Sequence, residues 1–179
     1  GWTDRPTQII QYASCHDNYT LADKLILSTG KAGVDSTIIK MNKLTAAVYM
    51  TAQGVPFIHA GEEFLREKLD EQGKRVENSY NAPDFVNKIR WTDLENKDTA
   101  KTVAYYQGLI ELRKAHAALR LSTKAEVAAN VEYRWITNEL VLFHIKGKGH
   151  VRGEVSDGIV VIFNATKQAK TVDLYAAGV

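Results

Sequence analysis

The sequence has little of what marks several large protein classes. Its 179 residues include one cysteine, Cys15, so an internal disulfide is excluded and the redox compartment stays open. Cys15 lies in an apolar run, which favours a small buried residue over a reactive thiol. No stretch approaches the ~18 apolar residues of a membrane span, and the N-terminus lacks the charged-then-apolar build of a signal peptide. We expect no membrane partner, while a cytoplasmic and a secreted location both stay open.

An excess of one charge is also missing. The 23 lysine and arginine residues face 21 aspartate and glutamate residues, which gives a net charge of +2. The mildly basic stretch Lys146–Arg152 has no aromatic residues among its charges and is typical of a solvated turn. We therefore expect no nucleic-acid partner. Apolar residues make up 45% of the chain and charged residues 25%, the balance of a globular protein with a buried core.

Several catalytic signatures are absent. No G-x-S-x-G motif is present, so nucleophilic serine catalysis has no support. The glycines of Gly30–Gly33 follow a predicted helix rather than a strand, which argues against a phosphate-binding loop. His16, Asp17, His59 and Glu62 are imaginable metal ligands, but their spacing matches no known ligand motif. We expect no metal and no cofactor.

The first half of the chain alternates strand-like and helical patterns. Two short apolar runs, Ile9–Cys15 and Val55–His59, predict strands. Between them, Thr20–Leu27 and a segment from Asp35 or Ser36 to Gly54 predict helices. Because both strands are apolar rather than alternating, they favour a parallel sheet that is covered on both faces.

The second half changes character. Gly61–Lys97 is long, polar and without periodicity, which is typical of a functional loop. A helix is predicted from Asp98 or Thr99 to about Ala118. Beyond Leu121 the pattern predicts antiparallel strands and no further helix. These strands are Glu132–Ile136, Leu140–Ile145, Ile159–Phe163 and, less clearly, Thr171–Leu174. We therefore expect two domains, residues 1–120 and residues 121–179.

Polar residues follow each of the first two predicted strands. In parallel α/β folds the reactive groups gather where strands end. A carboxylate beside an imidazole at such a place could orient a hydroxyl-rich ligand or stabilise a positive charge. The plain alternative is a loop cap with a satisfied histidine. The residues concerned are His16, Asp17 and Asn18 after the first strand, and His59, Glu62 and Glu63 after the second.

The long loop mixes aromatic residues with hydrogen-bonding ones. Aromatic faces stack on the apolar faces of sugar rings, while Asp, Asn and Arg side chains bind sugar hydroxyls. A loop packed down by its own aromatics is an equally good interpretation of the composition. The residues are Phe64, Tyr80, Phe85 and Trp91, with Arg66, Glu77, Asn78, Asn81, Asp84 and Asn87 among them.

Three segments carry a resemblance to a known family. Tyr12–Leu25, YASCHDNYTLADKL, resembles the seventh-strand motif of the α-amylase superfamily (glycoside hydrolase family 13) in its type I pullulanase form. Gln53–Arg66, QGVPFIHAGEEFLR, resembles the family's eighth strand and following turn. Glu77–Trp91, ENSYNAPDFVNKIRW, is similar to the pullulanase loop after that strand. The likeness spans roughly residues 2–118, and the β region beyond carries no specific motif.

The resemblance implies a fold and an activity. The fold would be α/β plus all-β: the last two βα units of a (β/α)₈ TIM barrel, then a partial antiparallel β-sandwich. The activity would be retaining hydrolysis of α-1,6-glucosidic bonds in pullulan, starch or glycogen. The family's nucleophilic Asp and acid/base Glu have no counterpart here and would precede Gly1. We therefore expect the isolated chain to be inactive, and to associate with itself or with the remainder of its barrel.

The resemblance also implies roles for individual residues. Asp17 matches the aspartate that stabilises the transition state, and His16 matches a histidine that hydrogen-bonds the sugar beside it. Asp84 and Asn87 match positions that hold the glucose one subsite further along. Tyr80 and Arg66 join the expected substrate-binding residues because of the loop's composition. The expected partner is an α-glucan.

Two alternatives stay open. Isoamylase-type and glycogen-debranching enzymes belong to the same superfamily, but they usually carry a longer asparagine-rich insertion than Ser28–Asp35 after the seventh-strand motif. A non-catalytic glucan-binding module is the alternative from another class. An upstream motif with the nucleophile and the acid would favour the enzyme over the module.

Overall fold

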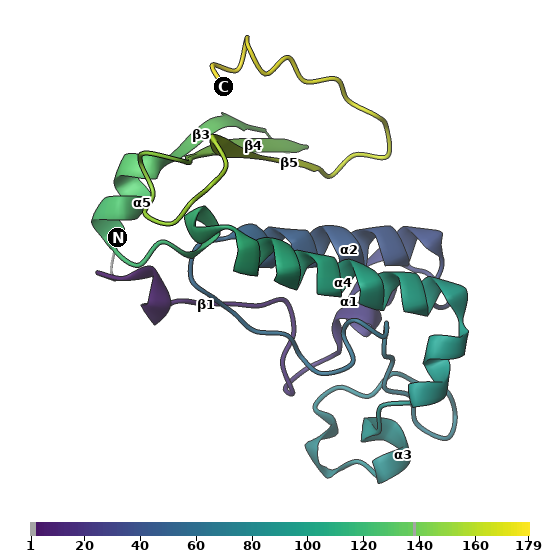
Figure 1. Ribbon diagram of the computed structural model, residues 1–179. Coiled ribbons are helices and arrows are strands. Elements are labelled where there is room, and N and C mark those ends of the chain that lie inside the picture. The colour runs from purple at the N-terminus through teal and green to yellow at the C-terminus, as the bar shows by residue number, and fades with distance from the viewer. Residues whose placement is uncertain (1–2, 138) are drawn as a thin grey trace. The chain divides into compact units, whose positions relative to one another are not determined.

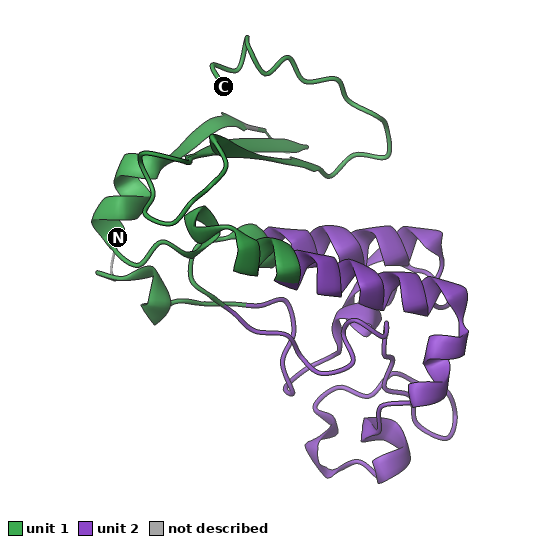
Figure 2. Cartoon of the chain, viewed as in Figure 1, with its two compact units in different colours: residues 1–11, 50–55, 111–179 green, residues 12–49, 56–110 purple. Residues whose placement is uncertain are grey.

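The computed structural model describes residues 3–137 and 139–179 (Figure 1). The chain forms two compact units, each assembled from separate stretches of sequence (Figure 2). Unit 1 comprises residues 1–11, of which 3–11 are described, together with 50–55 and 111–179. Unit 2 comprises residues 12–49 and 56–110. The expected division into 1–120 and 121–179 stays a prediction.

Most of the helical structure falls in the first two thirds of the chain, where periodicity predicts it. Short 3₁₀ turns accompany the helices at η1 (Pro6–Gln8), η2 (Ser79–Asn81), η3 (Trp91–Glu95) and η4 (Ala117–Arg120). The helices are α1 (Leu21–Thr29), α2 (Ser36–Thr51), α3 (Asp84–Asn87), α4 (Lys97–Ala115) and α5 (Lys124–Asn130).

Side-chain caps determine where the main helices begin. The Thr20 hydroxyl accepts the Asp23 N–H at the start of α1, and Gly30 ends that helix in the left-handed region at φ 66°. At α2, the carboxylate of Asp35 accepts the first free amides, as expected. At α4 the cap is Asn96, whose Oδ1 accepts the amides of Asp98 and Thr99. The helix therefore begins earlier than we expected.

Helices α2 and α4 run side by side in Figure 1. Within unit 2, the Tyr106 hydroxyl of α4 lies 3.0 Å from Asn42 Oδ1 of α2, and both residues are buried. Ile38 of α2 and Ile26 of α1 are fully buried in the same unit. Helices α1, α2 and α4 thus contribute buried side chains to the core of unit 2.

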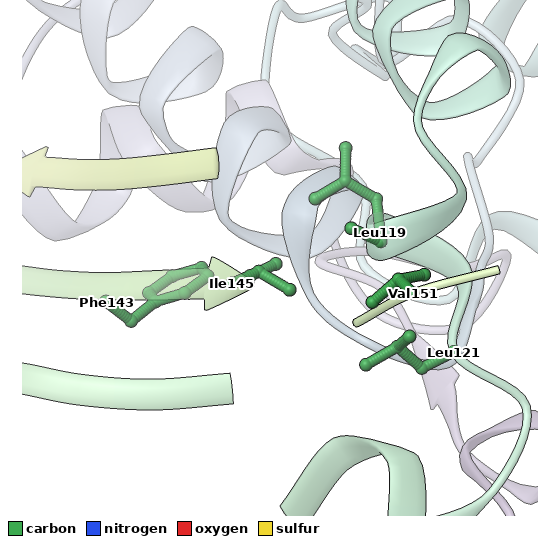
Figure 3. Close-up of a cluster of buried hydrophobic side chains, with 6 residues drawn as sticks. Leu119, Leu121, Phe143, Ile145 and Val151 are labelled. Carbon is green, nitrogen blue, oxygen red and sulfur yellow. The ribbon is translucent and has the colours of Figure 1, made fainter. Parts of the chain in front are cut away.

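The strands of unit 1 form an antiparallel sheet of order β3-β4-β5. They span β3 (Val131–Ile136), β4 (Leu140–Lys146) and β5 (Gly158–Asn164). One face of this sheet packs on a cluster of buried side chains, shown in Figure 3, in which Phe143 and Ile145 of β4 pack with Leu119, Leu121 and Val151. The three clearly predicted strands are thus present, each within one or two residues of its expected ends.

The expected TIM-barrel units are wrong. The described residues contain no βα unit of a barrel: the predicted strands Ile9–Cys15 and Val55–His59 shrink to β1 (Ile10–Gln11) and β2 (Val55–Pro56). Within the part of the chain that the structure describes, these two pair only with each other, and an isolated pair of strands is marginally stable. Ile10 is 53% exposed and Val55 39%, so the pair lacks the cover on both faces that apolar parallel strands require.

Two expectations for the β region are also wrong. The strands form a single sheet in the described residues rather than a sandwich, and Thr171–Leu174 forms no strand. Helix α5 was not expected. Its signal is nevertheless local: Thr123 Oγ1 accepts the Glu126 N–H at 3.1 Å, and the Glu126 carboxylate accepts the Thr123 N–H at 3.0 Å. This is the capping box that a T-x-x-E sequence predicts.

Candidate functional site

The segment after β1 presents a histidine and an aspartate to solvent. The side chain of His16 is 82% exposed and that of Asp17 is 66% exposed, with His16 Nε2 3.5 Å from Asp17 Oδ1. The next residue, Asn18, has φ 61°, a left-handed conformation that Asn tolerates better than most residues. Cys15, expected to be buried, is partly buried, and its sulfur lies 3.8 Å from the Asp17 carbonyl oxygen. The Asp17 carboxylate is therefore accessible to a ligand.

A hydrogen bond from a backbone N–H to a side chain joins this segment to the long loop. The N–H of Asn18 donates to Asn78 Oδ1 at 2.6 Å, across sixty positions of sequence. Asn78 is itself left-handed, at φ 49°, and directly precedes η2. Two of the three segments that carry the family resemblance thus lie together in unit 2.

The aromatic residues of the loop divide into two groups. Phe64 is buried and meets the ring of Trp91 edge to face, with 5.4 Å between ring centroids. Tyr80 is 83% exposed. Asp84, at the first position of α3, is also exposed. Packing accounts for Phe64, whereas Trp91, which is 69% exposed, Tyr80 and Asp84 are accessible to a ligand.

Asn87 has a different environment from Asp84. Its amide nitrogen donates to the carbonyl oxygens of Ser79 and Ala82, at 2.7 and 3.3 Å. Its Oδ1 accepts the Ser79 hydroxyl at 2.7 Å. These bonds lie within the loop and set the shape of the turn that carries Tyr80. The substrate contact expected of Asn87 stays a prediction.

Arg66 is buried beneath the same loop. One guanidinium nitrogen, Nη1, donates to the Asn87 carbonyl oxygen at 2.9 Å, and Nη2 lies 3.1 Å from His59 Nε2. Its Nε is buried without a hydrogen-bond partner among the described residues. Desolvation by burial lowers the pKa of Arg66, although nearby carboxylates oppose that effect. The observed contacts of Arg66 hold the loop, and its expected contact with substrate stays a prediction.

Glu62, one of the strand-end carboxylates, is buried in a polar cluster. Its Oε2 accepts the Ser14 hydroxyl at 2.7 Å, and its Oε1 accepts the hydroxyls of Tyr49 at 2.7 Å and Tyr106 at 3.1 Å. Burial raises the pKa of Glu62 and outweighs these three hydrogen bonds, which lower it. Burial and the charge of Glu62 also raise the pKa of both tyrosines. Glu62 thus ties Ser14, just before His16, to helices α2 and α4.

His59 lies between Ser14 and Arg66. Its Nδ1 is 3.5 Å from Ser14 Oγ, and its Nε2 faces the Arg66 guanidinium. Burial, followed by the positive charge of Arg66, lowers the pKa of His59 to about 4. Because the guanidinium can only donate, Nε2 is the acceptor and Nδ1 carries the proton of the neutral ring.

A second network of buried polar side chains, centred on Lys68 and Asp23, was not predicted from the sequence. Lys68 Nζ donates to Ser79 Oγ at 2.7 Å, and the Lys68 N–H donates to Asp23 Oδ2 at 3.0 Å. Asp23 Oδ1 is 3.2 Å from Arg75 Nε, a close ion pair that lacks hydrogen-bond geometry. Burial raises the pKa of Asp23 against the effect of these partners. A lysine in a polar stretch gives no sequence signal that it is buried.

The described residues contain no group of three or more His, Cys, Asp or Glu side chains placed to hold a metal ion. None of their helices is long and apolar enough to cross a membrane.

Replacing Glu62 tests the buried cluster. Glu62→Leu should lower the free energy of unfolding by about 2–6 kcal/mol, because the Ser14 and Tyr49 hydroxyls lose their acceptor, at ~1–3 kcal/mol for each buried unsatisfied group. The Tyr106 hydroxyl keeps Asn42 Oδ1 as an acceptor at 3.0 Å. Urea denaturation of variant and parent measures the difference. Glu63→Leu is the matched control, since Glu63 accepts the Gly61 N–H and should cost about 1 kcal/mol. Equal losses in the two variants would contradict the role given to Glu62.

Comparison with known proteins gives the same family from sequence and from structure. Residues 87–178, just over half of the chain, match the family of alpha-1,6-glucosidases, pullulanase-type, C-terminal. A pullulanase of Bacillus subtilis (strain 168) is 38% identical over 162 residues, which cover 90% of this chain and 21% of that protein. The chain thus spans about a fifth of the length of this relative.

Solved pullulanase structures match along most of the chain. The pullulanase of Paenibacillus barengoltzii, in complex with maltohexaose and alpha-cyclodextrin, matches with a TM-score of 0.81 and 38% identity, over 92% of this chain and 24% of that one. The type I pullulanase of Bacillus subtilis str. 168, complexed with maltose, matches with a TM-score of 0.81 and 35% identity, over 92% and 23%. The chain belongs to the family of pullulanase-type alpha-1,6-glucosidases.

Proposed function

We propose that the protein carrying this chain is a glycoside hydrolase that cleaves α-1,6-glucosidic bonds in α-glucans by a retaining mechanism. In this proposal the chain supplies groups that hold the substrate and stabilise the transition state. The observation that carries it is the hydrogen bond from Asn18 N–H to Asn78 Oδ1, 2.6 Å long. It places the exposed Asp17 segment beside the turn that exposes Tyr80 and leads to Asp84.

The chemistry of these side chains suits a glucan. Glycoside hydrolysis passes through an oxocarbenium-like transition state, and a carboxylate such as Asp17 stabilises the positive charge that develops there. His16 lies beside it and can hydrogen-bond a sugar hydroxyl. Tyr80 offers an aromatic face to a sugar ring, and Asp84 can accept hydrogen bonds from hydroxyls. The complexes of related pullulanases with maltohexaose, alpha-cyclodextrin and maltose support an α-glucan as ligand.

Arg66, which is buried, and Asn87, which is partly buried, support a second assignment. Both side chains bond to the loop backbone. We propose that their main role is to hold Tyr80 and Asp84 in place, and that contact with substrate is a secondary role.

Assays on two polysaccharides test the activity. The full-length protein should release reducing ends from pullulan, whose maltotriose units are joined by α-1,6 bonds, and should leave amylose, which has α-1,4 bonds, intact. Hydrolysis of amylose at the same rate would contradict the assignment. Binding of both glucans without hydrolysis would favour the non-catalytic module.

Asp84→Ala in the full-length protein should act mainly on substrate binding. Loss of a carboxylate that accepts hydroxyl hydrogen bonds one subsite from the cleaved bond should raise KM for pullulan about tenfold, since a hydrogen bond to a charged group is worth ~1.5–3 kcal/mol. The kcat should fall less, because remote binding energy is only partly used in the transition state. Asp157→Ala, which removes an exposed aspartate of unit 1, is the control. An unchanged KM in Asp84→Ala would refute the role.

We also propose that the isolated chain associates with itself or with the rest of its protein. The support is the exposure of large apolar side chains in each unit, Ile10 and Val55 in unit 1 and Tyr12 and Phe57 in unit 2, each of which leaves more than a third of its surface in water. Exposed apolar surface of this kind favours association. Light scattering on the purified chain should give a mass above that of a 20.0 kDa monomer. A stable monomer would contradict this part of the proposal.

A further inference from the structure

We infer that His59 is a positioning residue of this site: its imidazole joins the segment that carries Asp17 to the loop that carries Tyr80 and Asp84. The expected effect on the rate of hydrolysis rests on the proposed function. The hydrogen bonds through which His59 connects the two segments can be tested without any assay of activity.

The first link runs through Ser14. This serine is fully buried, and its hydroxyl donates its single proton to Glu62 Oε2 at 2.7 Å. The hydroxyl oxygen can therefore only accept from His59 Nδ1, 3.5 Å away. Ser14 stands two residues before His16 and three before Asp17. A shift of its hydroxyl would move the backbone on which both exposed side chains stand.

The second link runs through Arg66 and Asn87. The guanidinium donates to His59 Nε2 at 3.1 Å and to the Asn87 carbonyl oxygen at 2.9 Å. The Asn87 amide in turn binds the carbonyl oxygens of Ser79 and Ala82. A continuous path of hydrogen bonds thus leads from the Asp17 segment through His59 to the turn that exposes Tyr80.

Both links require a neutral ring that is protonated on Nδ1. The groups that act on His59 are Arg66, Lys68, His16 and Lys24, with Glu62 beyond the Ser14 hydroxyl. The cationic neighbours and the burial of the ring disfavour a second proton, which keeps its pKa near 4. Nε2 therefore stays available as the acceptor for Arg66 throughout the neutral range.

Hydrogen exchange measured by mass spectrometry on the full-length protein tests the joining. His59→Leu removes both the donor and the acceptor, whereas His59→Gln retains one of each. In the Leu variant, peptides covering 14–18 and 77–87 should both exchange about fivefold faster, the factor that corresponds to a lost hydrogen bond of ~1 kcal/mol. The Gln variant should stay close to the parent, and β3–β5 should not change in either variant.

Kinetics provide the second readout. The Leu variant should lose roughly 10- to 100-fold in kcat/KM on pullulan, because small displacements of positioned groups are costly, and the Gln variant should retain most of the parent kcat/KM.

If the parent protein fails to cleave pullulan, the proposed function fails, while the exchange data still decide the inference. Unchanged exchange in either segment would overturn it. So would faster exchange throughout α2 and α4, which would mark His59 as an ordinary core residue. If the Leu variant does not fold, Arg66→Lys breaks the second link, and peptides covering 14–18 should then exchange faster as well as 77–87. Parent-like exchange of 14–18 in that variant would overturn the inference.

Discussion

The purified 179-residue chain should release no reducing ends from pullulan under conditions in which we expect the full-length protein to hydrolyse it. Retaining hydrolysis needs a nucleophile and an acid/base carboxyl about 5–5.5 Å apart. The carboxylates closest in sequence to the second strand are all engaged in structural contacts. Glu62 is buried under three hydroxyls, Glu63 accepts the Gly61 N–H, and Glu67 pairs with Arg75. None of them stands ready to attack a sugar.

The assay needs proof that the chain is folded. Circular dichroism of the isolated chain should show the helices and strands described above, and only a sample that passes this test enters the comparison. Equal molar amounts of chain and full-length protein are then incubated with pullulan, and reducing ends are counted. Turnover by the isolated chain near that of the full-length protein would mean that a nucleophile and an acid lie within these residues, and that our assignment of Asp17 is incomplete.

Local signals predicted helices α1, α2 and α4 and the later strands well, but not α3 or α5. Thr20, Asp35 and the glycine at position 30 mark helix ends through contacts within a few residues, which a sequence displays directly. The strands of the β region are short apolar or β-branched runs separated by turns, so their positions also follow from local pattern. A search for helix caps would also have predicted α5, because Thr123 and Glu126 form a capping box at its start.

The prediction of barrel units was wrong because strand formation depends on partners that lie far away in sequence. Apolar runs such as Ile9–Cys15 predict strands only if other strands and helices are present to pair with them and cover them. In the described residues β1 has one partner, β2, and the runs leave the ladder after two residues each. A resemblance in sequence carries motifs reliably, but it does not guarantee that the architecture around them is present in the same chain.

In the candidate site, too, some features follow from local sequence and others depend on distant partners. Exposure of Asp17, Tyr80 and Asp84 agrees with their expected contact with a ligand. Arg66 is equally polar, yet its guanidinium turns inward to a carbonyl and an imidazole. The direction of a long side chain depends on partners far away in sequence, and neither composition nor spacing encodes it.

The expected role of Asp17 is electrostatic, and this determines which substitution is informative. Asn has nearly the same shape as Asp and can keep the hydrogen bonds that a carboxylate accepts through one oxygen, but it carries no negative charge. The side chain is well exposed and stands on a backbone that Ser14 and Asn18 hold by their own bonds. The substitution should therefore leave the fold unchanged, so that a loss of rate reports on the charge itself.

Asp17→Asn in the full-length protein should lower kcat on pullulan by ~10²–10³, which corresponds to roughly 2.7–4 kcal/mol of transition-state stabilisation. The KM should change much less, because the positive charge that Asp17 faces develops only on the way to the transition state. Steady-state kinetics give both constants, and unchanged thermal unfolding confirms the fold. Asp157→Asn, the same substitution at an exposed aspartate of unit 1, should keep the parent kcat. A parent-like kcat in Asp17→Asn would remove Asp17 from the catalytic machinery. A rise in KM with kcat unchanged would make it a substrate-binding residue instead, because uniform binding affects ground state and transition state alike.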